Sequence, residues 1–89
     1  MTYRVETSQR VQKAMARLPR KDQARILVVL KSLAEDPRPT GCRPVKDAPE
    51  GTYRVRVGDY RVIYEIHDDR LVVLVLRVAH RRDVYRGRD

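Results

Sequence analysis

The sequence predicts an α+β domain, in which an N-terminal strand and an αα-hairpin precede a three-stranded antiparallel meander and both helices pack on one face of the sheet. Apolar residues recur with helical spacing between positions 11 and 34, and they alternate with polar residues on both sides of Gly58-Asp59. Residues 71–76 are an unbroken apolar run. Eighty-nine residues leave room for one modest core, so we expect a single domain over residues 1–89.

Residues 3–6 combine aromatic and β-branched side chains and predict a short first strand. Thr7 or Ser8 can then cap a helix, because either hydroxyl can accept a hydrogen bond from a free N–H of the first turn. Pro19 ends this helix. Its apolar side chains fall at i, i+3, i+4 and i+7 and predict one buried face, formed by Val11, Ala14, Met15 and Leu18.

A second helix is predicted over residues 21–35 and ends at Asp36-Pro37. Only Pro19-Arg20 separates the two helices, so they form an antiparallel hairpin. Val28 and Val29 widen the apolar arc of the second helix, which can therefore pack on the sheet and also contact another chain. The residues expected to point inward are Ile26, Leu27, Leu30, Leu33 and Ala34.

Residues 37–51 contain four prolines and two glycines, a density that predicts a crossover loop without helix or central strand. The last sheet segment starts at the apolar run of residues 71–76. A run without alternation is typical of a strand buried on both faces. We therefore expect this strand to be central or nearly central and to end near Ala79.

A two-residue loop at Gly58-Asp59 determines the register of the hairpin, because it places Val57 opposite Tyr60. Arg56 is then opposite Arg61, and one face collects Arg54, Arg56 and Arg61. Like charges directly opposite each other destabilise a sheet. A bound polyanion would compensate for this cost, and a solvated cationic face is the alternative. The other face collects Tyr53, Val55, Val57, Tyr60, Val62 and Tyr64.

The composition points to a phosphate-rich partner, because Lys+Arg 20 against Asp+Glu 12 gives a formal charge of +8. Nucleic acid is the first candidate partner, and an acidic protein is the second. The lone Cys42 and the absence of any Cys/His cluster predict a reducing compartment, with no structural metal and no cofactor. The sequence shows neither a signal peptide nor a membrane span, which predicts a cytoplasmic protein without a membrane partner.

Two motifs resemble the RelE-type toxins of the RelE/ParE superfamily, which act in type II toxin-antitoxin modules. They are Gly-Asp-Tyr-Arg-Val-Ile-Tyr at residues 58–64 and Val-Ala-His-Arg-Arg-Asp-Val-Tyr at residues 78–85, separated by one apolar strand. The resemblance covers essentially the whole chain. It implies the fold derived above, metal-independent cleavage of messenger RNA in the ribosomal decoding site with inhibition of translation, and silencing by a cognate antitoxin protein.

The resemblance also implies roles for individual residues. The family's basic pair falls on Arg54 and Arg56, which would bind RNA phosphates, and its other motifs supply Arg61, Arg81 and Tyr85 as catalytic residues. Well-known members often carry lysines at the basic pair. Arginine effectively cannot lose its proton, so both positions are suited to stabilising charge and not to transferring protons.

Ribonuclease chemistry without a metal needs a base for the 2′-hydroxyl, cations for the charge on the phosphorane, and a stabilised leaving 5′-oxygen. Guanidiniums suit the second need because their planar forks match phosphate oxygens. We expect Arg61 and Arg81 to clamp the phosphate and Tyr85 to act as the base or to stack on a nucleobase. Strand alternation from Val72 places His80 on the face of Arg61, which makes it an accessory candidate.

Two other function classes fit the same sequence. A ParE-like toxin would inhibit DNA gyrase by binding and would lack nuclease activity. A basic RNA-binding module would have no toxicity at all. Growth arrest that the product of a neighbouring gene relieves would exclude the module, and gyrase inhibition without RNA cleavage would select the ParE-like toxin.

Overall fold

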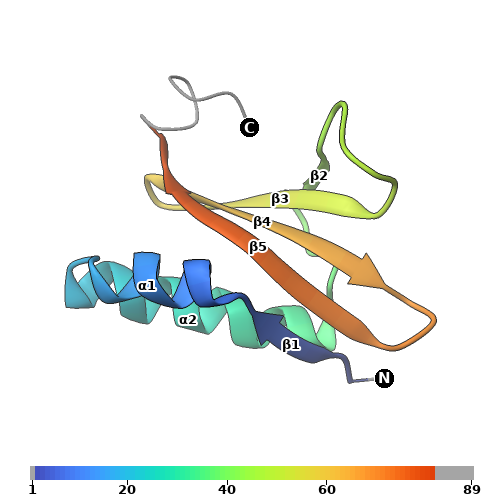
Figure 1. The fold of residues 1–89 in the computed structure, drawn as a ribbon, viewed down its shortest axis with the longest axis horizontal. Coiled ribbons are helices and arrows are strands. Elements are labelled where there is room, and N and C mark those ends of the chain that lie inside the picture. Colours follow the sequence, from blue (N-terminus) through green and yellow to red (C-terminus); the bar gives the residue numbers. More distant parts are fainter. Residues whose placement is uncertain (1, 82–89) are drawn as a thin grey trace.

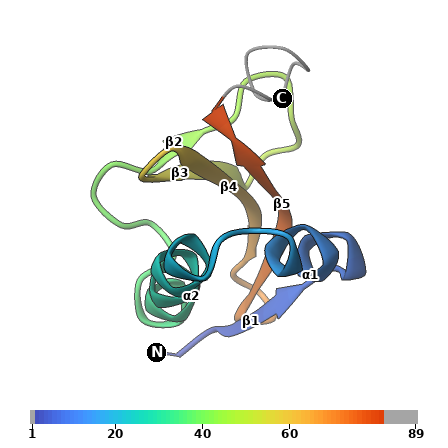
Figure 2. The ribbon, with the colours of Figure 1, turned by 90° about the vertical axis from the view of Figure 1, so that its left-hand side faces the viewer.

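The computed structural model describes residues 2–81 and has two layers (Figures 1 and 2). Two helices cover one face of a five-stranded sheet, and the opposite face is open. The predicted fold class is therefore confirmed. The elements are β1 (Arg4–Thr7), α1 (Gln9–Ala16), α2 (Arg20–Glu35), β2 (Arg43–Pro44), β3 (Thr52–Val57), β4 (Tyr60–His67) and β5 (Val72–His80).

The strand order is β1-β5-β4-β3-β2, with β3, β4 and β5 forming the predicted meander. β1 pairs in parallel with residues 72–75 of β5, and the intervening helices supply the crossover that a parallel pair needs. β2 corrects the sequence prediction, because two residues of the expected loop pair with β3. Pro44 is tolerated there since β2 is an edge strand, where one side needs no hydrogen-bond donor.

The two helices begin and end close to the predicted positions. The Oγ atom of Ser8 accepts a hydrogen bond from the backbone N–H of Val11 at 3.1 Å and caps α1. α1 ends at Ala16, before Pro19 is reached, so the proline does not itself terminate the helix. Pro19 instead precedes α2, and its carbonyl accepts the N–H groups of Asp22 and Gln23 at 3.0 Å each.

One stripe of α2 enters the core, and this stripe is narrower than predicted. Ile26, Leu30 and Leu33 are buried, whereas Leu27 is 46% exposed and Val28 is 68% exposed. The expectation that Leu27 points inward is therefore wrong. Successive helical residues are about 100° apart, so a sheet that covers the row i, i+4, i+7 leaves the residue after Ile26 at the margin.

A β-bulge in β5 determines which residues reach the open face. Ile63 lies opposite Arg77, but the next residue, Tyr64, lies opposite Val75, so Leu76 is an extra residue in β5. Val75 faces the helices before the bulge, and Val78 packs against the same core after it. Even-numbered residues after Leu76 therefore face the helices and odd-numbered ones face outward. The apolar run conceals this change because it has no alternation to interrupt.

Candidate nucleic-acid interface on the open face

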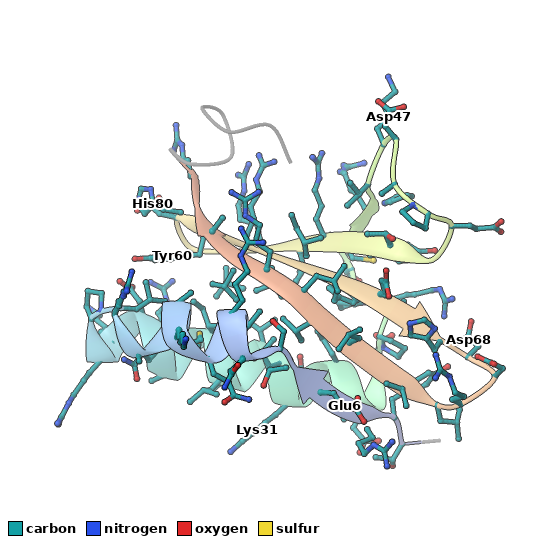
Figure 3. The ribbon with its side chains drawn as sticks, in the orientation of Figure 1. Glu6, Lys31, Asp47, Tyr60, Asp68 and His80 are labelled. Carbon is teal, nitrogen blue, oxygen red and sulfur yellow. The ribbon has the colours of Figure 1, made fainter. Side chains whose placement is uncertain are left out.

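The predicted register of the β3–β4 hairpin is confirmed, and it places arginines in two rows across the sheet. One row contains Arg56 and Arg61, followed by Ala79 of β5. The second row runs across four strands through Arg43, Arg54, Ile63 and Arg77. Figure 3 shows nitrogen-tipped side chains standing on the face opposite the helices. We call Arg43, Arg54, Arg56, Arg61, Arg77 and Arg81 the basic face.

Two adjoining depressions connect these arginines. The larger, of about 410 Å³, is lined by Gly41, Arg43, Arg54, Arg56 and Arg61. The smaller, of about 120 Å³, is lined by Arg56, Arg61 and Arg81 together with residues 58–60. Both depressions share Arg56 and Arg61, so the expected catalytic arginines and the expected phosphate-binding pair line one continuous surface.

The tip of the β3–β4 hairpin holds the end of β5 in place. Gly58 has a φ of 60°, which a residue with a side chain rarely adopts, and this allows the tight turn. The backbone N–H of Arg81 donates a hydrogen bond to the carbonyl of Asp59 at 2.7 Å. Arg81 is exposed and lies beside Arg61 at the smaller depression. The turn thus fixes the backbone from which the Arg81 side chain extends.

His80 does not join the basic face, contrary to the sequence prediction. It pairs with Tyr60 on the side of the helices, and the two rings meet edge to face with centroids 5.2 Å apart (Figure 3). The bulge at Leu76 is the physical reason, because one extra residue inverts the direction of every later side chain. His80 is therefore not positioned to act as an accessory residue of this site.

Tyr60 is also unsuited to act as a base. Its hydroxyl donates a hydrogen bond to the Asp22 carboxylate at 3.4 Å. Burial, and then the negative charge of Asp22, raise the pKa of Tyr60 above its usual value of about 10. The phenol therefore keeps its proton near neutral pH. Tyr85, the other expected catalytic residue, lies outside the described residues.

Sequence reasoning missed two members of the basic face. Arg43 lies in the proline-rich segment, for which the sequence predicted only a loop. The pairing of β2 with β3 places it opposite Arg54 on the open face. Arg77 follows the bulge, so alternation counted from Val72 assigns it to the wrong face. The one available signal was that a charged residue directly follows a long apolar run.

The other end of the open face carries mixed charge. Arg4 and Glu6 form an ion pair of 2.8 Å, and the His67 imidazole lies 3.0 Å from the Glu65 carboxylate. At the adjacent β4–β5 turn, on the side of the helices, Asp68 accepts hydrogen bonds from Arg38 at 2.9 Å and from the hydroxyl of Tyr3, which packs against the core. The cations of the basic face are therefore concentrated toward the Gly58 end, away from these ion pairs.

Residues 2–81 contain neither a candidate metal site nor a helix that could span a membrane. No three His, Cys, Asp or Glu side chains there are grouped so as to hold a metal ion. No helix in the same residues is long and apolar enough to cross a membrane.

Comparisons with known proteins agree with this architecture. The family described as "ParE toxin of type II toxin-antitoxin system, parDE" matches residues 5–85. Toxin RelG of Mycobacterium tuberculosis is 32% identical over 87 residues, covering 97% of this chain and 99% of that protein. Toxin RelE of the same organism is 33% identical over 85 residues, covering 94% and 87%.

Solved structures give the same assignment. The archaeal RelE–RelB complex from Pyrococcus horikoshii OT3 contains a chain with a TM-score of 0.80 and 32% identity, and the match covers 100% of both chains. The RelBE2 complex from Mycobacterium tuberculosis also has a TM-score of 0.80, with 28% identity and coverage of 93% and 95%. The chain therefore belongs to the RelE/ParE superfamily of type II toxin-antitoxin toxins, as a RelE-type member.

Proposed function

We propose that this toxin is a ribosome-dependent endoribonuclease that cleaves messenger RNA and thereby inhibits translation. The observation that carries the proposal is the convergence of Arg54, Arg56, Arg61 and Arg81 on two adjoining depressions of one face. The similarity of this chain to toxins named RelE and RelG, which covers 94% or more of its residues, supports the same activity.

The proposed reaction is an internal transesterification. The ribose 2′-oxygen attacks the adjacent phosphorus, so that an O2′–P bond forms while the P–O5′ bond breaks. Tyr85 accepts the proton of the 2′-hydroxyl, and the leaving 5′-oxygen takes up a proton from solvent. The products are a 2′,3′-cyclic phosphate and a 5′-hydroxyl, and the balance requires no metal.

The arginines have distinct proposed tasks. Arg61 and Arg81 line the smaller depression together and would hold the scissile phosphate as negative charge builds up on its oxygens. By analogy with oxyanion-hole donors, each would lower the barrier by about 2–4 kcal/mol. Arg54 and Arg56 would hold the neighbouring phosphates. Positive charge close to Tyr85 would favour its phenolate form and so make it a stronger base.

We further propose that a cognate antitoxin silences the toxin. The RelE chains of the Pyrococcus horikoshii and Mycobacterium tuberculosis structures are in complexes with RelB. A toxin with a formal charge of +8 is complementary to an acidic segment that covers Arg61 and Arg81.

Mapping transcript cleavage on translating ribosomes tests the proposal. Arg61→Ala, Arg81→Ala and Tyr85→Phe should each reduce cleavage by about 10²- to 10³-fold. Arg70→Ala is the matched control, because it removes the same charge from the turn at the opposite end of the β4–β5 pair and should cut normally. Full cleavage by both Arg81→Ala and Tyr85→Phe would refute the assignment of these residues.

The matching family's description names ParE, and this favours gyrase inhibition as the second candidate function. A supercoiling assay with purified gyrase separates the two candidates. If the toxin inhibits gyrase and leaves transcripts on ribosomes intact, its function is gyrase inhibition and not RNA cleavage.

A further inference from the structure

We propose that α1 forms a second phosphate-binding surface, which Arg77 joins to the basic face and which contacts the backbone of a structured RNA while the basic face holds the single strand to be cut. This inference rests on the proposed RNA substrate. It concerns Arg10, Lys13, Arg17 and Arg77, none of which belongs to the expected catalytic set.

Three cations form a stripe along α1. The helix advances about 100° per residue, so Arg10, Lys13 and Arg17 lie within roughly 60° of arc. Val11 lies off this stripe and is 1% exposed, which fixes the helix against the core and turns the stripe outward. All three cationic residues are exposed. A depression of about 490 Å³ runs along the stripe and is lined by Gln9, Arg10, Lys13, Ala14 and Arg17.

Part of the charge of this stripe opposes the stability of its own helix. Lys13 stands three residues after Arg10 and four before Arg17, and like charges at these spacings destabilise a helix. Arg10 lies in the first turn, where a cation opposes the helix dipole and no acidic residue offsets it, whereas Lys13 in the last turn is favourably placed. No carboxylate of residues 2–81 forms an ion pair with any of the three. An external polyanion would compensate for this arrangement.

Arg77 joins the stripe to the basic face. It is in the cross-strand row of Arg54 and Ile63, and it also lines a depression of about 170 Å³ with Arg10. Val11, Ala14, Val78 and Ala79 complete that depression. β1 pairs with β5 only as far as Val75, so the edge of β5 beyond the bulge faces α1 instead of another strand. The positive surface therefore continues around this edge.

The extent of this surface implies two phosphate backbones. The row from Arg43 to Arg77 crosses three inter-strand spacings, or about 14 Å, and α1 lies in the second layer beyond it. A single strand that is held at Arg61 and Arg81 and follows the sheet would not reach the outer side of α1. A folded RNA presents a second backbone beside that strand, which an extended single strand cannot do.

Salt-dependent binding to two 2′-O-methylated RNAs tests the inference, because methylation blocks cleavage. One probe is a hairpin with a single-stranded 3′ extension, and the other is the extension alone. Arg10→Gln/Lys13→Gln/Arg17→Gln should reduce the slope of log K against log salt by about 2.5–3 for the hairpin probe. It should leave the slope for the extension unchanged, whereas Arg56→Gln should reduce both slopes.

Lys31→Gln is the matched control for Lys13→Gln, because both replace an exposed helical lysine by glutamine. Figure 3 shows Lys31 projecting below the helices, away from the sheet. The Lys13 variant should lose about one unit of slope on the hairpin probe and the Lys31 variant none. Glutamine keeps the helix propensity of lysine, so circular dichroism should show an intact fold.

Equal loss on both probes, or loss on neither, would overturn the inference. Weakened antitoxin binding with unchanged RNA binding would overturn it too and would assign α1 to the antitoxin. Failure of the wild-type toxin to bind either probe would also reject it. If the salt slopes are as predicted but messenger RNA is not cleaved, only the proposed nuclease activity is rejected and the second surface stands.

Discussion

Replacing Arg56 by threonine should stabilise the fold while weakening RNA binding. Arg56 lies directly opposite Arg61 in the β3–β4 pair. Directly opposite residues have Cβ atoms about 4.5–5.5 Å apart, and splayed guanidiniums would hold their charges roughly 7 Å apart. Two unit charges at that distance repel by about 0.6 kcal/mol in water and by somewhat more beside a protein surface.

Relief of this repulsion should raise the free energy of unfolding by about 0.5–1 kcal/mol. For a domain of this size, that corresponds to an increase in Tm of about 2–8 °C. The gain should shrink as salt is added, since the Debye length falls from about 10 Å at 0.1 M to 3 Å at 1 M. Urea unfolding at low and high salt measures both effects.

Arg4→Thr is the matched control, because it makes the same change in a strand where the arginine is ion-paired. The Nε atom of Arg4 lies 2.8 Å from the Glu6 carboxylate, and both side chains are exposed. Its unfolding free energy should change by less than about 0.5 kcal/mol. Cross-strand repulsion is not the cause if the Arg56→Thr variant is no more stable than the Arg4→Thr variant at low salt. The same holds if the gain in unfolding free energy does not change with salt.

Three further outcomes test the core and the ion pairs. Tyr64→Phe should cost about 1–2 kcal/mol in urea unfolding, because the buried phenol donates a 2.8 Å hydrogen bond to the Pro37 carbonyl, which would lose its partner. Leu33→Ala should cost about 2–5 kcal/mol and Leu27→Ala less than about 1, and equal costs would contradict the assigned helix face. The Arg38 guanidinium and the Tyr3 hydroxyl hold the pKa of the Asp68 carboxyl below its usual range. Asp68 therefore stabilises the fold at neutral pH, and this contribution is lost as the pH falls below about 4. In thermal unfolding, the Tm of Asp68→Asn should fall less over that pH range than the Tm of the wild type.

The basic face illustrates a conflict between stability and binding. Arginines directly opposite each other, as in the Arg43–Arg54 and Arg56–Arg61 pairs, oppose sheet formation. The same arrangement concentrates positive charge where a phosphate backbone would bind. Variants that remove this charge should therefore gain stability and lose function together.

Much of the architecture was predictable because its signals are local. Helical spacing and the cap at Ser8 located α1, and the tight turn at Gly58 determined the register of the β3–β4 hairpin. A two-residue turn leaves one pairing for its flanking strands, so Arg54, Arg56 and Arg61 could be assigned to one face from the sequence alone.

The remaining features depend on contacts between distant segments. Arg43 joined the basic face only when β2 paired with β3, and Leu27 was left exposed because the sheet covers a narrow stripe of α2. The bulge at Leu76 leaves no trace in an apolar run, yet it directs Arg77 and Arg81 outward and His80 toward the helices. By itself the sequence determined the elements and the hairpin register, because these follow from neighbouring residues. Only the tertiary structure decided which later side chains reach the site, because one unpaired residue inverts strand alternation and its position depends on the partner strand.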